Sequence, residues 1–447
     1  MEMRPFLPDR AAVWGSRVFL LLLGILYLLQ IASPLRLNID SIQILEMAAS
    51  AADGNGFNTS NRETIRYPPG YSAVIALLDI VGLGTSWMFV LLNGFWAALG
   101  VAASYFVYRK TFELSESVAL LLCGLVLLGH MLIKHVTLPM TDVMFFGIAM
   151  AVVPILSCVP QAQGSRRWRL LLLAAVLIAL SMTVRATGVA LIPAFLWAVA
   201  AGLDKEQWRR LGPYRYVLLF LGTGILLVLV FGPWNHKHLT VVGKVLASFV
   251  NEKSEGALRY MFFYRPLPWG ELLLNMPRTR VPVPWEMLRL VYFFVGYAGI
   301  ITMVVMIWRR RRKIGPAEIY MLTFFALLYV WKGSNSRLWL PVLPLMLGWL
   351  ALAVQEGLKW KIVRFAAVVY VLWFIFSGSA ALLYSTRISL SSTATFPDRY
   401  GSGELTPAYR IAFEGTPTTL DRTMSRRALA LLIRYEPRVH ERFKDNP

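Results

Sequence analysis

The sequence predicts an all-α polytopic membrane protein, and three observations support that prediction. Apolar residues make up 57% of the 447 residues, whereas charged residues make up only 16%. The mean hydropathy of +0.56 is far above the usual range of soluble domains. The net charge is +20, but the lysines and arginines stand in short clusters between apolar runs. That placement is typical of cytoplasmic loops, so nucleic acid is not expected as a partner.

Eleven apolar runs approach the length of about 20 residues that a helix needs to cross a bilayer. No small-residue cleavage site follows the first run, so we expect a retained anchor rather than a removed signal peptide. A further run over 71–83 is too short to cross the membrane and predicts an interfacial or re-entrant helix. The predicted spans cover residues 17–33, 86–108, 117–133, 142–159, 170–186, 187–203, 215–233, 286–308, 316–332, 338–355 and 362–384.

The lysines and arginines also predict the orientation of these spans. With the N-terminus in the cytoplasm, every cytoplasmic loop is basic, as the positive-inside rule requires. The polar segments 34–85, 134–141 and 234–285 then lie outside, together with a tail over 385–447. We therefore predict a multi-pass protein of the plasma or inner membrane. Its transmembrane domain covers residues 1–384, and its tail is extracytoplasmic.

Asp40 directly follows the first span and begins a helical pattern that also contains Glu46. Two interpretations are open, because aspartate is a good N-cap residue but Asn38 could cap the helix instead. In the second case the Asp40 carboxylate is available for chemistry. The later turn RYPPG contains Arg66 and Tyr67. It is either a stiff turn before the short helix or a means of holding a cation beside Asp40.

The turn at 134–141 precedes a second acidic residue, Asp142, at the outer end of a span. A charged residue costs about 2.5–3.5 kcal/mol at the centre of a membrane helix and less near its end, so Asp142 needs a partner or a function. It either pairs with Lys134 or takes part in a reaction. Arg185 and Arg337 also lie at predicted outer ends of spans, where they either extend to the interface or serve the same site.

The predicted topology brings two carboxylates and several cations to one face of the membrane. Inverting group transfer from a lipid phosphate needs such a set, because a carboxylate removes the proton of the acceptor hydroxyl while cations stabilise the departing phosphate. The segment 259–274 is expected to lie on the membrane as an amphipathic stretch, with Arg259 and Arg265 available to phosphate. His236 and His238 form an H-x-H pair without a third ligand. No metal site and no cofactor is therefore predicted, although a divalent metal stays open.

A series of short motifs follows the same order as in a known family. Asp40 with Glu46 is followed by ADGNGF, RYPPGYS, TLPMTD, MTVRATG, GPWN and SRLWLPVLP. In these motifs, residues 17–384 resemble the GT-C superfamily of polyprenyl-phosphate-sugar-dependent glycosyltransferases, notably the protein mannosyltransferases and the aminoarabinose transferases that modify lipid A. One departure is Ser41, which stands where many relatives have a glutamate after the aspartate. The tail over 385–447 lies outside the resemblance.

The resemblance implies a GT-C fold and an integral-membrane inverting glycosyltransferase. Such an enzyme transfers a hexosyl or pentosyl group from a polyprenyl-phosphate donor to an acceptor hydroxyl on a glycan, lipid or protein. It implies that Asp40 is the general base and Asp142 the second acidic residue of the site, with Glu46 as a further catalytic candidate. The residues expected to bind substrate are Arg66, Tyr67, Lys134, His135, Arg185, Arg259, Arg265 and Arg337.

Two functions of other classes compete with transfer. A lipid-linked glycan transporter or flippase should show paired broken helices near the membrane midplane and two related halves. A noncatalytic membrane scaffold should keep Asp40 and Asp142 far apart or facing lipid. This sequence concentrates its ionisable groups at one predicted face, so transfer is the preferred prediction.

Overall fold

The fold is entirely helical in the part of the chain that the structure describes. This computed structural model describes residues 9–59, 67–202, 262–278, 286–330, 335–357, 360–391, 403–415 and 423–444. Every regular element in these ranges is a helix, so the predicted all-α membrane class is confirmed. The longer helices are α1 (Asp9–Leu29), α4 (Ser86–Lys110), α7 (Thr141–Cys158), α8 (Gly164–Val184), α15 (Glu286–Arg309), α17 (Leu343–Gly357) and α18 (Lys361–Ser389).

Within these ranges, seven helices are long and apolar enough to cross a membrane. An eighth span results if α5 (Glu116–Leu127) and α6 (His130–Val136) are counted together, although the pair is bent by 55°. Two further predicted spans are shorter apolar helices, α9 (Ile192–Gly202) and α16 (Pro316–Val330). The predicted span over 215–233 lies outside the described residues.

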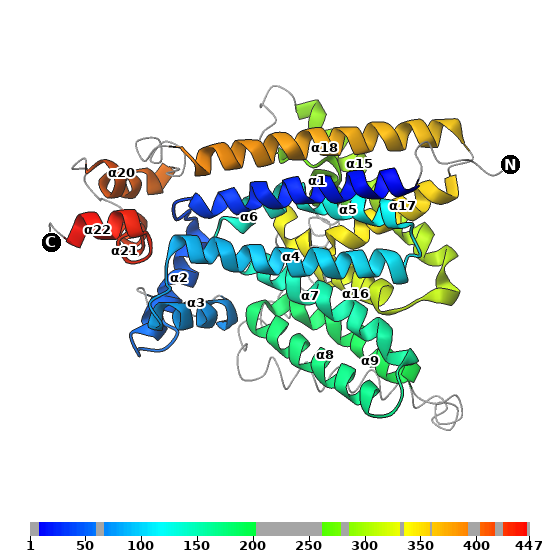
Figure 1. Cartoon of the computed structure of the whole chain (residues 1–447), viewed down its shortest axis with the longest axis horizontal. Coiled ribbons are helices and arrows are strands. Elements are labelled where there is room, and N and C mark those ends of the chain that lie inside the picture. Colours follow the sequence, from blue (N-terminus) through cyan, green and yellow to red (C-terminus); the bar gives the residue numbers. More distant parts are fainter. Residues whose placement is uncertain are drawn as a thin grey trace, which may run out of the picture.

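The long helices run side by side, and glycine allows the closest approaches between them. Figure 1 shows α1, α4 and α18 along the long axis of the molecule, with α7 beside α4. A Cβ on Gly147 of α7 would lie 2.5 Å from the backbone oxygen of Trp96 on α4. A Cβ on Gly100 of α4 would lie 2.3 Å from the ring of Phe146. Small residues at helix contacts are typical of membrane bundles, where close van der Waals packing drives association.

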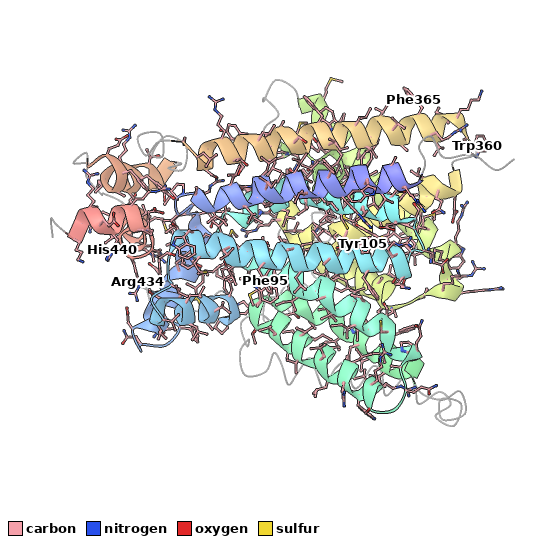
Figure 2. The ribbon with its side chains drawn as sticks, in the orientation of Figure 1. Phe95, Tyr105, Trp360, Phe365, Arg434 and His440 are labelled. Atoms are coloured by element: carbon pink, nitrogen blue, oxygen red, sulfur yellow. The ribbon has the colours of Figure 1, made fainter. Side chains whose placement is uncertain are left out.

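Large apolar side chains cover the outside of the bundle. Phe95 on α4 is 60% exposed and Phe365 on α18 is 71% exposed, and both project outward in Figure 2. Trp360, directly before α18, is also 60% exposed. In water such a surface would be unfavourable, whereas in a bilayer these side chains contact hydrocarbon. The exposed apolar surface therefore agrees with a membrane-spanning bundle.

One end of the bundle carries a group of shorter helices. The helices α2 (Ile39–Ala52) and α3 (Gly70–Ile80) lie there, next to the tail helices α20 (Thr406–Glu414), α21 (Thr423–Tyr435) and α22 (Pro437–Lys444), while α1 begins at the other end (Figure 1). The run predicted to be a short interfacial helix forms α3, which has 11 residues. Ser72 donates a hydrogen bond to the Ile44 carbonyl at 3.0 Å and so joins α3 to α2.

Within the segment 259–274, residues 266–274 are largely buried and do not form the surface stretch that the sequence predicts. The described part of this segment contains α14 (Pro266–Leu274), in which Trp269 is only 1% exposed. A Cβ on Gly270 would lie 1.9 Å from the Tyr292 carbonyl oxygen, so α14 packs directly against α15. The helix α14 is itself apolar except for Glu271, and a helix that is apolar on all sides is stable only when it is buried. The prediction of an amphipathic stretch on the membrane is therefore wrong for residues 266–274, whereas Phe262, Phe263 and Tyr264 before them are about half exposed.

Ion pairs join the tail to α2 and α3. Arg427 of α21 forms an ion pair with Glu46 of α2. Arg434 lies 2.7 Å from Asp53 Oδ1 and 2.9 Å from Asp79 Oδ2, so it joins the end of α2 to α3 (Figure 2). The tail is thus held to both helices by side chains of opposite charge.

Two further contacts join the tail to the chain between α1 and α2. Glu436 Oε2 accepts a hydrogen bond from the Leu35 backbone N–H at 2.8 Å. Tyr409 donates to the Leu35 carbonyl at 2.6 Å and accepts from the Leu37 N–H at 3.0 Å. Because Leu35 and Leu37 lie shortly before α2, these bonds hold the tail against the segment that leads into α2.

Candidate active site

Asn38, not Asp40, caps α2. The Asn38 side chain accepts a hydrogen bond from the Ser41 N–H at 2.7 Å, and the Ser41 hydroxyl accepts from the Asn38 N–H at 2.7 Å. This reciprocal pair is a capping box, which satisfies two backbone donors at the helix start. Asp40 lies one residue inside the first turn, so its carboxylate is not used as the cap. Ser41, at the position where many relatives have an acid, is buried and serves the cap.

Both oxygens of Asp40 have partners from distant parts of the chain. The Tyr67 hydroxyl donates a hydrogen bond to Asp40 Oδ1 at 2.5 Å. Arg337 Nη1 lies 2.5 Å from Asp40 Oδ2. Arg337 belongs to the short helix η7 (Ser336–Val342), and its own N–H is capped by the Asn335 side chain at 3.1 Å. The Asp40 side chain still keeps 23% of its surface exposed, so it is reachable from outside.

Asp142 and Arg185 form a second, deeper ion pair. Asp142 lies in the first turn of α7 with only 1% of its side chain exposed, and the Arg185 guanidinium contacts it. Arg185 stands where α8 ends, in extended backbone, which turns its side chain away from the helix. Of the two interpretations for Arg185, the structure therefore supports a place beside Asp142 rather than at the interface.

Arg337 connects the two acidic residues. It interacts electrostatically with Asp142 as well as with Asp40. His135, only 2% exposed, also interacts electrostatically with Asp142, and its Nδ1 lies 2.7 Å from the Met131 carbonyl oxygen. Two carboxylates and two guanidinium groups thus form one network where four separate segments of the chain meet.

A cavity of 410 Å³ opens beside Asp40. One wall is the start of α2, and the other belongs to the tail. The cavity combines two carboxylates with apolar side chains, a mixture suited to a polar group carried on an apolar body. Its lining residues are Asn38, Ile39, Asp40, Glu404, Leu405 and Met424. The last three were not foreseen from the sequence, because they belong to no motif and lie outside the family resemblance.

Glu46 lies apart from this cavity. It pairs with Arg427 through both carboxylate oxygens. Six helical residues separate it from Asp40, which amounts to about 9 Å along the axis and roughly 120° around it. A catalytic role for Glu46 stays a prediction, and the contact that the structure gives it is with the tail.

The remaining predicted substrate-binding residues fall into three groups. Tyr67 contacts Asp40, as described above. Lys134 is exposed on α6, whereas Arg265, directly before α14, is only 4% exposed. Arg66 and Arg259 lie outside the described residues, as do His236 and His238. Among the described residues, no three histidines, cysteines or carboxylates come together as a candidate metal site.

The charges at the tail interface shift the pKa values of two acids in opposite directions. The hydrogen bond from Arg434 holds the pKa of Asp53 below its usual value. Burial raises the pKa of Glu436 above its usual value, although hydrogen bonds from Leu35 and Ser86 act against this effect. Both acids lie outside the membrane-spanning helices. The attachment of the tail is therefore expected to depend on pH.

No protein-family model matches the sequence, and no curated protein is significantly similar to it. Solved structures, however, share the fold. ArnT from Cupriavidus metallidurans in the apo state superposes with a TM-score of 0.52 at 16% identity, over 95% of this chain and 85% of that chain. The oligosaccharyltransferase of Archaeoglobus fulgidus, tethered with an acceptor peptide, gives a TM-score of 0.52 at 9% identity, over 95% of this chain but only 64% of that one. The predicted GT-C fold is thereby confirmed.

Proposed function

We propose that this chain with the GT-C fold is an integral-membrane inverting glycosyltransferase. It takes a sugar from a polyprenyl-phosphate donor and transfers it to an acceptor hydroxyl at the membrane face that carries Asp40. We assign that face to the extracytoplasmic side, on the basis of the basic loops described above. The donor class rests on the motif resemblance, and the fold shared with an oligosaccharyltransferase agrees with it.

The observation that carries the proposal is the position of Asp40. Its carboxylate borders a cavity on one side and contacts Arg337 on the other. A general base needs access to the acceptor, and a phosphate leaving group needs a cation close to the reacting bond. In this arrangement Asp40 borders the cavity as the base, and Arg337, in contact with Asp40, supplies the cation.

The chemistry follows from these positions. Asp40 accepts the proton of the acceptor hydroxyl while that oxygen attacks the anomeric carbon of the sugar. The bond between this carbon and the phosphate oxygen breaks, and the electron pair stays on the polyprenyl phosphate. Attack from the side opposite the leaving group inverts the configuration at the anomeric carbon.

Arg337 has a double role in this proposal. Before the donor binds, it neutralises Asp40 at 2.5 Å. A bound donor phosphate competes for the same guanidinium and forms charge-assisted hydrogen bonds with it. As Arg337 turns toward the phosphate, Asp40 becomes the stronger base. Asp142, which is itself paired with Arg185, attracts Arg337 through its negative charge and so helps to hold it beside Asp40.

Mass spectrometry of envelope glycans and lipids, from cells with and without the protein, would identify donor and acceptor together. Transfer is then measured with the purified full-length protein in proteoliposomes. Asp40→Asn should abolish transfer, because an amide cannot accept the proton, while membrane insertion and thermal stability stay close to those of the wild type. Normal turnover by Asp40→Asn would refute the role of Asp40.

The same proteoliposomes distinguish transfer from transport. Transport moves the lipid-linked sugar between leaflets without breaking its bond to phosphate, whereas transfer releases polyprenyl phosphate. Within the described residues one bent helix pair, α5 with α6, is present, whereas a transporter of the inverted-repeat type needs a matching pair in its other half. Movement between leaflets without release of polyprenyl phosphate would favour the transporter.

A further inference from the structure

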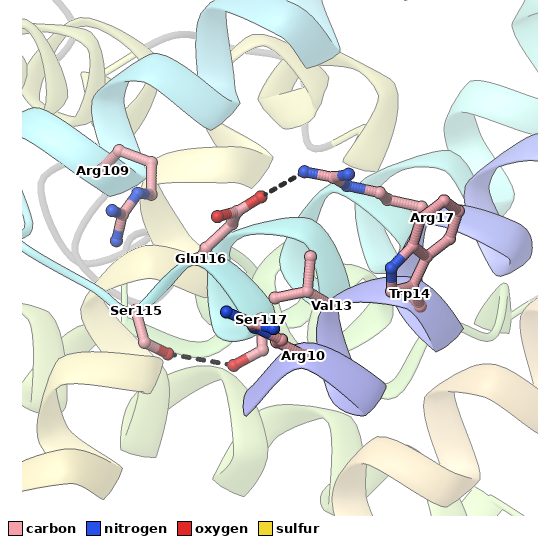
Figure 3. A pocket seen from close by; sticks show the side chains of 8 residues that line it. All are labelled: Arg10, Val13, Trp14, Arg17, Arg109, Ser115, Glu116 and Ser117. Atoms are coloured by element: carbon pink, nitrogen blue, oxygen red, sulfur yellow. Dashed lines mark hydrogen bonds and ion pairs between the residues drawn. The ribbon is translucent and has the colours of Figure 1, made fainter. Parts of the chain in front are cut away.

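A second cavity lies at the opposite end of the bundle from Asp40. It has a volume of 700 Å³ and opens between the start of α1, the end of α4 and the start of α5 (Figure 3). It shares no lining residue with the cavity beside Asp40. Its lining residues are Arg10, Val13, Trp14, Arg17, Arg109, Ser115, Glu116 and Ser117.

The cavity carries a surplus of positive charge. Three arginines face one glutamate, and Glu116 lies 2.8 Å from Arg17 (Figure 3). Arg109 donates to the Leu114 carbonyl, which uses only one of its guanidinium donors. The guanidinium groups of Arg10 and Arg109 therefore leave the lining with two net positive charges. A ligand with a phosphate group would balance that charge.

Neutral donors complete the polar side of the cavity. Ser115 caps α5 by accepting a hydrogen bond from the Val118 N–H at 3.4 Å, and its hydroxyl lies 3.2 Å from that of Ser117. The start of α5 also carries the positive end of the helix dipole. Hydroxyl groups and a helix start beside arginines form a set of donors that suits phosphate oxygens.

An apolar strip leads away from the cavity along α1. Trp14 is 66% exposed, with Arg17 stacked 5.8 Å from the centre of its ring. Val18, Leu21 and Ile25 follow with exposures of 51%, 65% and 46%. Their spacing of four, three and four residues places all four side chains on one face of the helix. Tryptophan is typical of the membrane interface, so the strip runs from headgroup level into the hydrocarbon.

We propose that this cavity binds the headgroup of an anionic glycerophospholipid, with an acyl chain lying along the strip Trp14, Val18, Leu21 and Ile25. Basic pockets between membrane helices are known to bind acidic headgroups. A free phosphate would satisfy the arginines and serines but would leave the apolar strip unused. The joined polar cavity and apolar strip therefore favour a lipid over a soluble anion.

Native mass spectrometry of the delipidated full-length protein tests this site. Phosphatidylglycerol is added to the protein in detergent, and phosphatidylcholine serves as the neutral comparison. We expect Arg10→Gln with Arg109→Gln to weaken retention of phosphatidylglycerol about tenfold, because two surface charges are lost. Both side chains are exposed, so the fold should persist, and size-exclusion chromatography checks this. Unchanged retention by this variant would overturn the proposal.

A matched control removes the same charge nearby. Arg311→Gln with Arg312→Gln changes two arginines in the loop after α15, where the adjacent Lys313 lies 3.3 Å from Glu113 of the segment that follows α4. We expect this control to retain phosphatidylglycerol like the wild type. An equal loss in both double variants would mean general surface attraction and would overturn the site.

A third measurement separates a lipid from a soluble anion. Glycerol 3-phosphate carries the phosphate without acyl chains, so millimolar concentrations should not displace phosphatidylglycerol. Trp14→Ala should weaken lipid retention while leaving the arginines in place. Displacement by glycerol 3-phosphate, together with normal retention by Trp14→Ala, would show that the ligand is soluble and would overturn the lipid assignment.

Discussion

Arg337 holds Asp40 with its Nη1 atom 2.5 Å from Oδ2, although 297 positions separate the two residues in the sequence. This ion pair joins the helix that follows the first span to the short helix that leads into α17. Arg337 also interacts with the buried Asp142. The charges of these carboxylates and guanidinium groups are therefore nearly balanced, and under the proposed function a donor phosphate has to compete with Asp40 for the same guanidinium.

The first prediction concerns Arg337. Arg337→Gln should lower the rate of transfer about 100-fold or more, because one donor aimed at a developing charge is typically worth that much. Arg337→Lys should keep part of the activity but raise the KM for the donor, since lysine cannot offer two parallel hydrogen bonds. Steady-state kinetics in proteoliposomes measure both effects. Arg311→Gln, at the other end of the bundle, is the control and should behave as the wild type.

The second prediction concerns the buried pair. Asp142→Asn leaves Arg185 without its carboxylate, and such a loss typically costs about 3–5 kcal/mol. We expect a clear fall in Tm, measured by thermal unfolding in detergent. The double variant Asp142→Asn with Arg185→Gln should recover part of the loss, because no charge is then left unpaired. If the single and double variants unfold together, the pair does not stabilise this region.

The third prediction concerns pH and the tail. Because burial raises the pKa of Glu436, the folded tail binds a proton more tightly than the unfolded tail does. This contribution to stability is complete below the usual value of 4.5 and is lost as the pH rises through the raised pKa. The variant Glu436→Gln keeps an oxygen that accepts the hydrogen bond from the Leu35 N–H. Its amide carries no charge at any pH, so the loss of stability at high pH should disappear. Limited proteolysis should therefore release the tail of the variant more slowly than that of the wild type at pH 8.

Asp53→Asn removes an acid whose pKa is shifted in the opposite direction from that of Glu436. Arg434 lowers the pKa of Asp53, so this pair stabilises the tail above the usual pKa and stops doing so as the pH falls. The Asp53 side chain is half exposed, so the effect should be small. At pH 8 the Asp53→Asn tail should be cleaved slightly faster than the wild-type tail. Identical cleavage of both variants at every pH would contradict the roles of these two acids.

The fourth prediction concerns the contact between α4 and α7. Gly147→Ala places a methyl group against the Trp96 backbone, which cannot move without separating the helices. Overpacking of this kind typically costs about 1–3 kcal/mol. Gly94→Ala on α4 is the matched control, because a Cβ there meets nothing within 4 Å. Thermal unfolding should show a lower Tm for Gly147→Ala than for the wild type, whereas the Tm of Gly94→Ala should stay close to that of the wild type.

The fold class and the position of Asp40 were predictable because both depend on local properties. Hydropathy identifies membrane helices, since each must satisfy its own backbone hydrogen bonds in lipid. Asp40 stood out as a carboxylate at the end of an apolar run. A local rule also allowed Asp40 not to be the N-cap of α2, because Asn38 is an equally good capping residue.

The remaining features of the site depend on contacts between distant segments. Nothing near Glu46 in the sequence indicates that its partner is Arg427, and no motif marks Glu404 as a neighbour of Asp40. The burial of α14 was missed for a different reason. Flanking arginines suggested a surface stretch, whereas Gly270 allows a backbone contact that only the packed helix pair reveals.

The second wall of the Asp40 cavity comes from Glu404, Leu405 and Met424, which follow all of the described membrane helices. During synthesis, the helices leave the ribosome and enter the lipid before this wall exists. A nascent chain can therefore complete its membrane insertion while the cavity is still half built. The cavity becomes complete only when the final helices pack against α2 and α3.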